Sequence, residues 1–104
     1  MYAVIYRYRV DADKEEAFQE GWRRCSTAIR AQFGSYGARL HRSDDGLWLA
    51  YGRWPSAAAR APHLARVDFD PESFELMRSS IREELPELRL TIVEDLLDEP
   101  PRER

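Results

Sequence analysis

The side chains with the greatest chemical capacity in this sequence gather in one short stretch. The segment LHRSDDGLWLAYGRWPS, from Leu40 to Ser56, holds two tryptophans, a tyrosine, a histidine and two arginines on either side of Asp44-Asp45-Gly46. Aromatic side chains of this size fill a core, wall a pocket for a flat apolar ligand, or form a subunit interface. Their role depends on the faces on which the fold places them.

The middle of this stretch predicts a β-hairpin with a defined register. Ser43 to Gly46 is typical of a type I turn that has its glycine in the left-handed conformation. Such a turn places Ser43 opposite Leu47 and fixes the pairing of both strands, 38–42 and 47–54. The resulting cross-strand pairs are Arg42 with Trp48, Leu40 with Ala50, and Ala38 with Gly52.

This register separates an apolar face of the hairpin from a mixed one. The apolar face consists of Ala38, Leu40, Trp48, Ala50, Gly52 and Trp54. Small residues between the two indoles leave volume above the sheet. That volume is either filled by Phe18, Trp22 and Phe74 or left as a ligand cavity. For the second case, the predicted pocket residues are Phe18, Trp22, Trp48, Ala50, Gly52 and Trp54.

The other face of the hairpin combines aliphatic, aromatic and cationic groups. Its residues are Arg39, His41, Leu49, Tyr51 and Arg53. A mixture of this kind suits a subunit interface, where a hydrophobic centre is surrounded by polar groups. We therefore predict that these five residues contact a second copy of the chain.

The residues before the hairpin predict one strand and one long helix. Tyr2 to Val10 alternates with a period of two, as a strand does. Asp13 and Glu16 form a capping-box pattern at the expected start of the helix, and Gly34 is a plausible stop. The apolar stripe of this helix is Phe18, Trp22, Cys25, Ile29 and Phe33. Its position on this stripe favours a core role for Cys25 over a nucleophilic one.

The residues after the hairpin predict two more helices and a last strand. Ser56 caps a short helix that Pro62 ends, and Asp70, followed by a proline, begins the next helix. That helix is expected to run to Pro86 on the stripe Phe74, Met77, Ile81 and Leu85, before a strand over Leu88–Leu97. The fold class is therefore α+β, with the ferredoxin-like order βαββαβ: a four-stranded antiparallel sheet with two helices on one face. The uncovered sheet face predicts a homodimer.

Composition narrows the class of protein. A chain of 104 residues forms one domain, here residues 1–99, followed by a charged tail, 100–104, that we expect to be disordered. A net charge of −3 provides no basic field for nucleic acid. A single cysteine excludes a disulfide framework, and no segment suits a membrane span or a secretion signal, so we expect a cytoplasmic protein. Neither histidine has metal-ligand spacing, and we expect no metal site.

The chain resembles the antibiotic-biosynthesis-monooxygenase-like family of dimeric α+β barrels. The stretches that carry this resemblance are MYAVIYRY, GARLHRSDDGLWLAYGRWPS and IREELPEL. The resemblance implies a dimer packed sheet on sheet and a cavity between sheet and helices. Separately, the preference for arginine over lysine favours a bacterial source. Some members oxidise polycyclic phenols with molecular oxygen and without metal or flavin.

By this resemblance, the chain is expected to be a cofactor-independent monooxygenase for a small aromatic compound of phenolic or quinone type. His63 would act as the base or hydrogen-bonding group. The alternative is a non-catalytic dimeric module that binds a small apolar ligand or none. The haem-degrading branch uses asparagine, tryptophan and histidine; Trp54 and His63 match two of these, but the sequence contains no asparagine, which argues against haem degradation.

Overall fold

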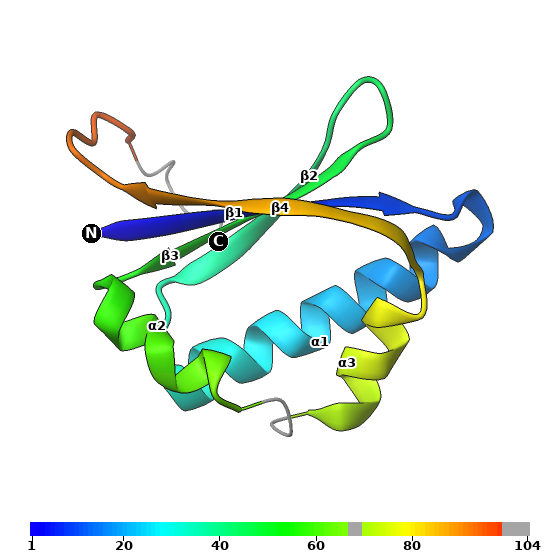
Figure 1. The fold of residues 1–104 in the computed structure, drawn as a ribbon, viewed down its shortest axis with the longest axis horizontal. Coiled ribbons are helices and arrows are strands. Elements are labelled where there is room, and N and C mark those ends of the chain that lie inside the picture. The colour runs from blue at the N-terminus through cyan, green and yellow to red at the C-terminus, as the bar shows by residue number, and fades with distance from the viewer. Residues whose placement is uncertain (67–69, 99–104) are drawn as a thin grey trace, which may run out of the picture.

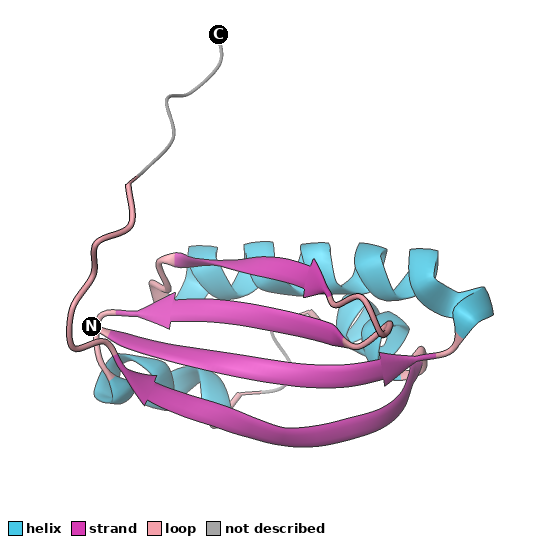
Figure 2. Cartoon of the chain, turned by 90° about the horizontal axis from the view of Figure 1, so that it is seen from above, coloured by secondary structure: helices cyan, strands magenta, loops and turns pink. Residues whose placement is uncertain are grey.

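A computed structural model describes residues 1–66 and 70–98 of the chain. Four strands form one antiparallel sheet in the order β2-β3-β1-β4, and three α-helices lie on one face of it (Figure 1). Figure 2 shows the opposite face, which no helix covers. The elements are β1 (Tyr2–Val10), α1 (Glu15–Phe33), β2 (Gly37–Arg42), β3 (Trp48–Trp54), α2 (Ala57–Leu64), α3 (Pro71–Arg78) and β4 (Ile81–Thr91), with a 3-10 turn at Ala12–Lys14. The predicted α+β class and ferredoxin-like sheet are confirmed.

The hairpin has the predicted register. The backbone N–H of Ser43 donates to the carbonyl of Leu47 at 2.8 Å, and Gly46 has a φ of 86°. That φ lies in the left-handed region, where glycine carries no steric penalty. The strand pairs are Arg42 with Trp48, Leu40 with Ala50, and Ala38 with Gly52, as predicted.

The boundary between the last helix and the last strand differs from the prediction. The helix was expected to reach Pro86, but α3 ends at Arg78 and β4 begins at Ile81. Ile81 and Leu85 are four residues apart, a spacing that a helix stripe and one face of a strand share. Pro86 is tolerated because β4 is an outer strand, and the register with β1 shifts around it. The strand also ends at Thr91, six residues before the predicted end.

Two helix ends also differ. Asp13 lies in the 3-10 turn and Lys14 occupies the N-cap position of α1 without a capping hydrogen bond, so the predicted capping box does not form. Ser56 caps α2 as expected, since its hydroxyl accepts from the N–H of Ala59 at 3.1 Å. Pro62 does not end α2 but lies inside it. In a helix this short, Pro62 removes only one backbone hydrogen bond.

The core lies between the sheet and the helices. Its centre is formed by Tyr8, Phe18, Trp48 and Ala50. Helices α1 and α3 meet closely at Gly21, where a Cβ would stand 2.6 Å from the backbone nitrogen of Met77. Only glycine permits this approach, which explains its place inside α1. None of the helices in the described ranges is long and apolar enough to cross a membrane. The tail predicted for residues 100–104 lies outside those ranges.

Candidate functional site

The helix-facing side of β3 is filled at one end. Phe18 of α1 is fully buried and meets the Trp48 ring edge to face, with centroids 5.3 Å apart. Tyr8 of β1 packs on the same phenyl ring at 5.8 Å. Core side chains therefore pack on Trp48 and Ala50, and a depression of about 320 Å³ at the β2 edge borders Trp48 as well. The indole nitrogen of Trp48 is nonetheless buried without a hydrogen-bond partner among the described residues.

The same side of β3 is open at its other end, at Gly52. A Cβ built on Gly52 would meet no atom of residues 1–66 or 70–98 within 4 Å, its two chain neighbours aside. Gly52 lies between Ala38 of β2 and Val4 of β1, both short side chains. The combination leaves space between the sheet and the helices, which we call the Gly52 space. The predicted pocket residues thus divide into a filled end and an open end, and their role in ligand binding stays a prediction.

The Gly52 end of β3 finishes in an aromatic stack that includes His63. The imidazole of His63 lies 5.8 Å from the Trp54 ring at an interplanar angle of 16°, and 5.6 Å from the Phe33 ring of α1. Burial lowers the pKa of His63 below its usual value, and the nearby Arg60 guanidinium lowers it further. His63 is therefore neutral at pH 7, the protonation state that a base requires.

A buried arginine of α2 faces the middle of the sheet. Arg60 is 4% exposed. Its Nη2 donates to the phenolic oxygen of Tyr6 at 2.6 Å and to the Glu87 carboxylate of β4 at 2.7 Å. Burial raises the pKa of Tyr6, which keeps this phenol neutral. Because Tyr6 pairs with Ala50, it is a diagonal neighbour of Gly52 on the same face of the sheet.

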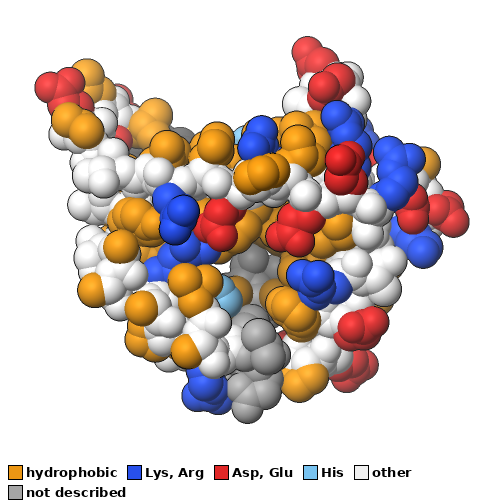
Figure 3. Space-filling model, viewed as in Figure 1, with side chains coloured by type: hydrophobic (Ala, Val, Ile, Leu, Met, Phe, Trp, Pro, Cys, Tyr) orange, Lys and Arg blue, Asp and Glu red, His pale blue; other side chains and the backbone are white. Residues whose placement is uncertain are grey.

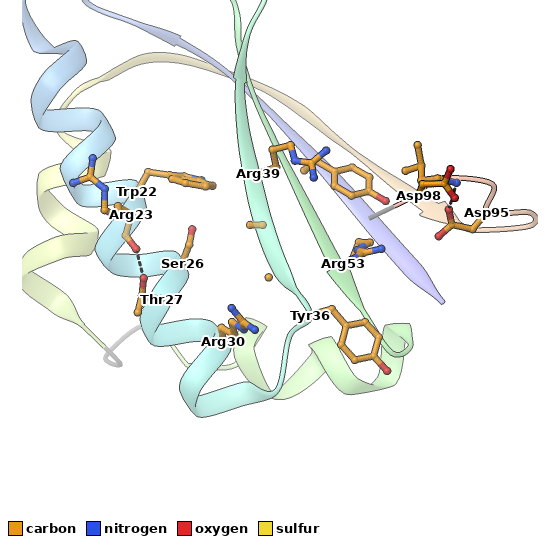
Figure 4. Close-up of a pocket in the computed structure, with 14 residues that line it drawn as sticks. Trp22, Arg23, Ser26, Thr27, Arg30, Tyr36, Arg39, Arg53, Asp95 and Asp98 are labelled. Atoms are coloured by element: carbon orange, nitrogen blue, oxygen red, sulfur yellow. Dashed lines mark hydrogen bonds between the residues drawn. The ribbon is translucent and has the colours of Figure 1, made fainter. Parts of the chain in front are cut away.

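Two depressions lie at opposite edges of the sheet. At the β2 edge, a groove of about 710 Å³ extends from α1 over β2 to Tyr51 and Arg53 of β3 and to the residues after β4. Figure 4 shows Trp22 and Ser26 of α1 pointing toward β2, and Arg39 and Arg53 beyond it. At the β4 edge, the surface is hollowed between α2 and α3, and charged side chains border the hollow (Figure 3). Since Ala38 lines the groove and pairs with Gly52, the groove adjoins the Gly52 space.

The predicted interface residues share the sheet face that no helix covers. Cross-strand pairing places Arg39 opposite Tyr51, His41 opposite Leu49, and Gly37 opposite Arg53. Three leucines of β4 lie on this face, Leu85, Leu88 and Leu90, and the last two are 42% and 39% exposed. The face therefore has the composition expected of a contact surface, while its partner stays a prediction.

The groups outside this region are less suited to catalysis or metal binding. Cys25 is buried, and burial raises the pKa of its thiol to about 11, so it is a core residue as predicted. No three histidine, cysteine, aspartate or glutamate side chains in residues 1–66 and 70–98 gather as a metal-binding group.

Sequence reasoning missed the cluster formed by Tyr6, Arg60 and Glu87. One available signal was the spacing of Arg60 and His63, which places both on the same face of a helix. The partners could not be found in this way, because Glu87 belongs to a strand whose start was assigned to a helix. The contact of Arg60 with Tyr6 joins residues 54 positions apart.

Comparisons with known proteins agree with this architecture. Rv0793 from Mycobacterium tuberculosis superimposes with a TM-score of 0.73 at 20% identity, over 92% of this chain and 98% of that one. SnoaB, a cofactor-independent oxygenase from Streptomyces nogalater, superimposes with a TM-score of 0.75 at 18% identity, over 93% and 97% of the two chains. At these identities the likeness establishes a shared fold. No curated protein sequence matches the chain.

The sequence itself provides the closer assignment. The sequence model of one family, described as antibiotic biosynthesis monooxygenase, matches residues 1–70 of the 104. That match spans β1, α1, the hairpin and α2, and so includes Gly52, Trp54 and His63. The chain therefore belongs to the antibiotic biosynthesis monooxygenase family.

Proposed function

We propose that this protein is a cofactor-independent monooxygenase that acts on a small aromatic compound of phenolic or quinone type. The observation that carries the proposal is the Gly52 space, which lies beside the Trp54–His63 stack on the side of β3 that faces the helices. Membership in the family and the likeness to SnoaB, described as a cofactor-independent oxygenase, support the reaction type.

Such a reaction needs three contributions from the protein. The site must hold a flat ring, help to form or stabilise the substrate anion, and keep water away from it. The anion then supplies the electrons to oxygen: a ring CH₂ becomes C=O, one oxygen atom enters the product, and the other leaves as water with the two hydrogens. Trp54 and the open side of Gly52 suit the ring, and neutral His63 suits the role of base.

A steric block at Gly52 tests the proposal. The Gly52→Leu variant places a large side chain into the Gly52 space, so it should abolish binding of phenolic ligands while the protein stays folded. Binding is read from the fluorescence of the three tryptophans, and turnover from oxygen uptake after dialysis against EDTA and without added flavin. If no compound in a phenolic and quinone panel stimulates uptake by the wild type, the proposed activity is wrong.

The filled end of β3 favours one alternative, a non-catalytic binding module. Phe18 packs edge to face on the Trp48 ring, so the space between the sheet and α1 is smaller at this end than the two indoles alone suggest. Ligand binding that Gly52→Leu abolishes, without oxygen uptake for any bound ligand, would support this alternative.

We also propose that two copies of the chain associate through the uncovered sheet face. The exposed leucines of β4 and the residues opposite the helices on β2 and β3 support this arrangement. A stable interface buries more than about 1,200 Å² in total. Light scattering should give twice the monomer mass, and Arg53→Glu should weaken the dimer. Arg24→Glu, on the exposed side of α1, is the matched control. A monomer mass at micromolar concentration would contradict the proposal.

A further inference from the structure

We infer that the ligand carries an ionised oxygen on its aromatic ring and that Arg60 binds this oxygen. The inference rests on the proposed function, because it places the ring in the Gly52 space. It adds a ligand class, aromatic anions, and a binding residue that the family resemblance did not point to.

The first observation is the incomplete use of the Arg60 guanidinium. Nη2 donates two hydrogen bonds, one to Tyr6 and one to Glu87. Nε is buried and has no hydrogen-bond partner among the described residues. A buried N–H donor without an acceptor is rare in folded proteins and is usually satisfied by a ligand or an ordered water. Arg60 therefore has an unused donor inside the protein.

The second observation is the charge around Arg60. Its nearest acceptors are a neutral phenol, Tyr6, and one carboxylate, Glu87, whose side chain is 38% exposed. Water screens the carboxylate more than it screens the guanidinium, which is 4% exposed. The neighbouring titratable group on the same helix, His63, is neutral. The other charged side chains of β4 on this side of the sheet are Glu84 and Arg89. The buried guanidinium is thus balanced by a single carboxylate that is itself partly exposed.

Position connects Arg60 with the ring site. Tyr6, to which Arg60 donates, is a diagonal neighbour of Gly52 on the same sheet face. Arg60 and His63 are three residues apart on α2, so they project from one side of that helix. A ring over Gly52 and against Trp54 would therefore have a base and a guanidinium on the same side.

An ionised oxygen fits this arrangement better than a neutral one. A hydrogen bond between a guanidinium and an anionic oxygen is charge-assisted and stronger than one to a neutral acceptor. For a phenol, the O–H proton leaves to His63 or to water, and the phenolate oxygen accepts from the Nε–H of Arg60. An aryl carboxylate would be held by the same contact.

The test compares anionic probes with neutral ones of the same shape. The probes are para-nitrophenol with para-nitroanisole, and para-nitrobenzoate with its methyl ester, added to the full chain. Wild-type protein should bind para-nitrophenolate at least tenfold more tightly than para-nitroanisole. Binding should also lower the apparent pKa of para-nitrophenol, which its absorbance reports directly. If both anions bind more tightly than their neutral counterparts, the site accepts aromatic anions in general. If only one of them does, the result shows whether the site takes a phenolate or a carboxylate.

Variants then assign the effect to Arg60. Arg60→Gln should weaken phenolate binding at least tenfold and change anisole binding less than twofold, and Arg60→Lys should restore part of the preference. Glu87→Gln should act in the opposite direction, strengthening phenolate binding severalfold, because it removes the compensating carboxylate. This variant keeps the inference falsifiable if Arg60→Gln does not fold. Arg24→Gln, on the exposed side of α1, is the control.

Several results would overturn the inference. The first is an equal loss of affinity for phenolate and anisole in the Arg60 variants, and the second is weaker phenolate binding in Glu87→Gln. The others are equal affinity of the wild type for the anion and the ether, and no binding of any probe by the wild type. If the wild type takes up oxygen but binds the anion and the ether with equal affinity, the proposed function is supported and this inference is wrong. Anion preference with no oxygen uptake for any phenolic compound would leave the inference standing without that function.

Discussion

Replacing two glycines by the same residue should change the stability in opposite directions. A Cβ at Gly21 would lie 2.6 Å from the backbone nitrogen of Met77 and 2.9 Å from the carbonyl oxygen of Ser73. Both atoms belong to the backbone of α3, so the two helices must separate. Overpacking of this kind costs about 1–3 kcal/mol, of which alanine's better helix propensity recovers about 1. Gly21→Ala should therefore lower the free energy of unfolding by up to about 2 kcal/mol.

The matched variant, Gly52→Ala, meets open space. Apart from its chain neighbours, no atom of the described part of the chain lies within 4 Å of the added Cβ, and φ is not in the left-handed region. Replacing glycine by alanine at a compatible site reduces the entropy of the unfolded chain and stabilises a protein by about 0.4–1 kcal/mol. For a domain of this size, 1 kcal/mol corresponds to a change in Tm of about 4–8 °C.

Thermal and urea unfolding, followed by circular dichroism at one protein concentration, measure both effects. Tm should fall by up to roughly 8–16 °C for Gly21→Ala and rise by roughly 2–8 °C for Gly52→Ala. A higher Tm for Gly21→Ala would mean that the helices do not meet as closely as described. A clear loss of stability in Gly52→Ala would mean that the Gly52 space is filled. The second result would also remove the main support for the proposed function.

Three smaller changes should have defined outcomes. Burial holds the pKa of His63 below about 6.5, so the unfolded chain binds a proton at this residue before the folded protein does as the pH falls. The stability that His63 provides above about pH 6.5 is therefore lost below it. Between about pH 7.5 and about pH 5.5, urea unfolding should show a smaller loss of stability in His63→Phe than in the wild type. Cys25, with a thiol pKa of about 11, should react with a thiol reagent at neutral pH only as fast as the protein unfolds. Ser56→Ala removes the cap of α2 and should cost about 1 kcal/mol in urea unfolding, whereas Ser56→Asp should keep most of the stability.

The sequence predicts the hairpin well because its information is local. Four residues, Ser43 to Gly46, determine the turn, and the turn determines every pair along β2 and β3. The start of β4 is predicted poorly for the opposite reason. Ile81 and Leu85 satisfy a helical spacing and a strand face equally, and the choice is made by pairing with β1, more than 70 positions away in the chain.

The candidate site follows the same division. Gly52 and Trp54 alternate with Arg53 along one strand, so their common face can be predicted from the sequence. Whether Phe18 fills the space near Trp48 cannot be predicted from the sequence, because it depends on how closely α1 approaches the sheet. Arg60 is harder still, since arginine in a short helix is usually exposed. Its burial results from two partners on different strands, β1 and β4.

The two ends of β3 have different structural roles. Where Phe18 and Tyr8 pack on Trp48, the sheet and α1 are held together by aromatic contacts, and a cavity there would reduce stability. At Gly52, which has no side chain, the sheet and the helices stay apart because the filled end fixes their separation. The Gly52 space thus depends on the rigidity of the Trp48 end. A Phe18→Ala variant should therefore lose about 3–5 kcal/mol of stability and also lose ligand affinity, although Phe18 touches the ligand in neither proposal. Loss of stability with unchanged affinity would mean that the space keeps its shape independently of the core.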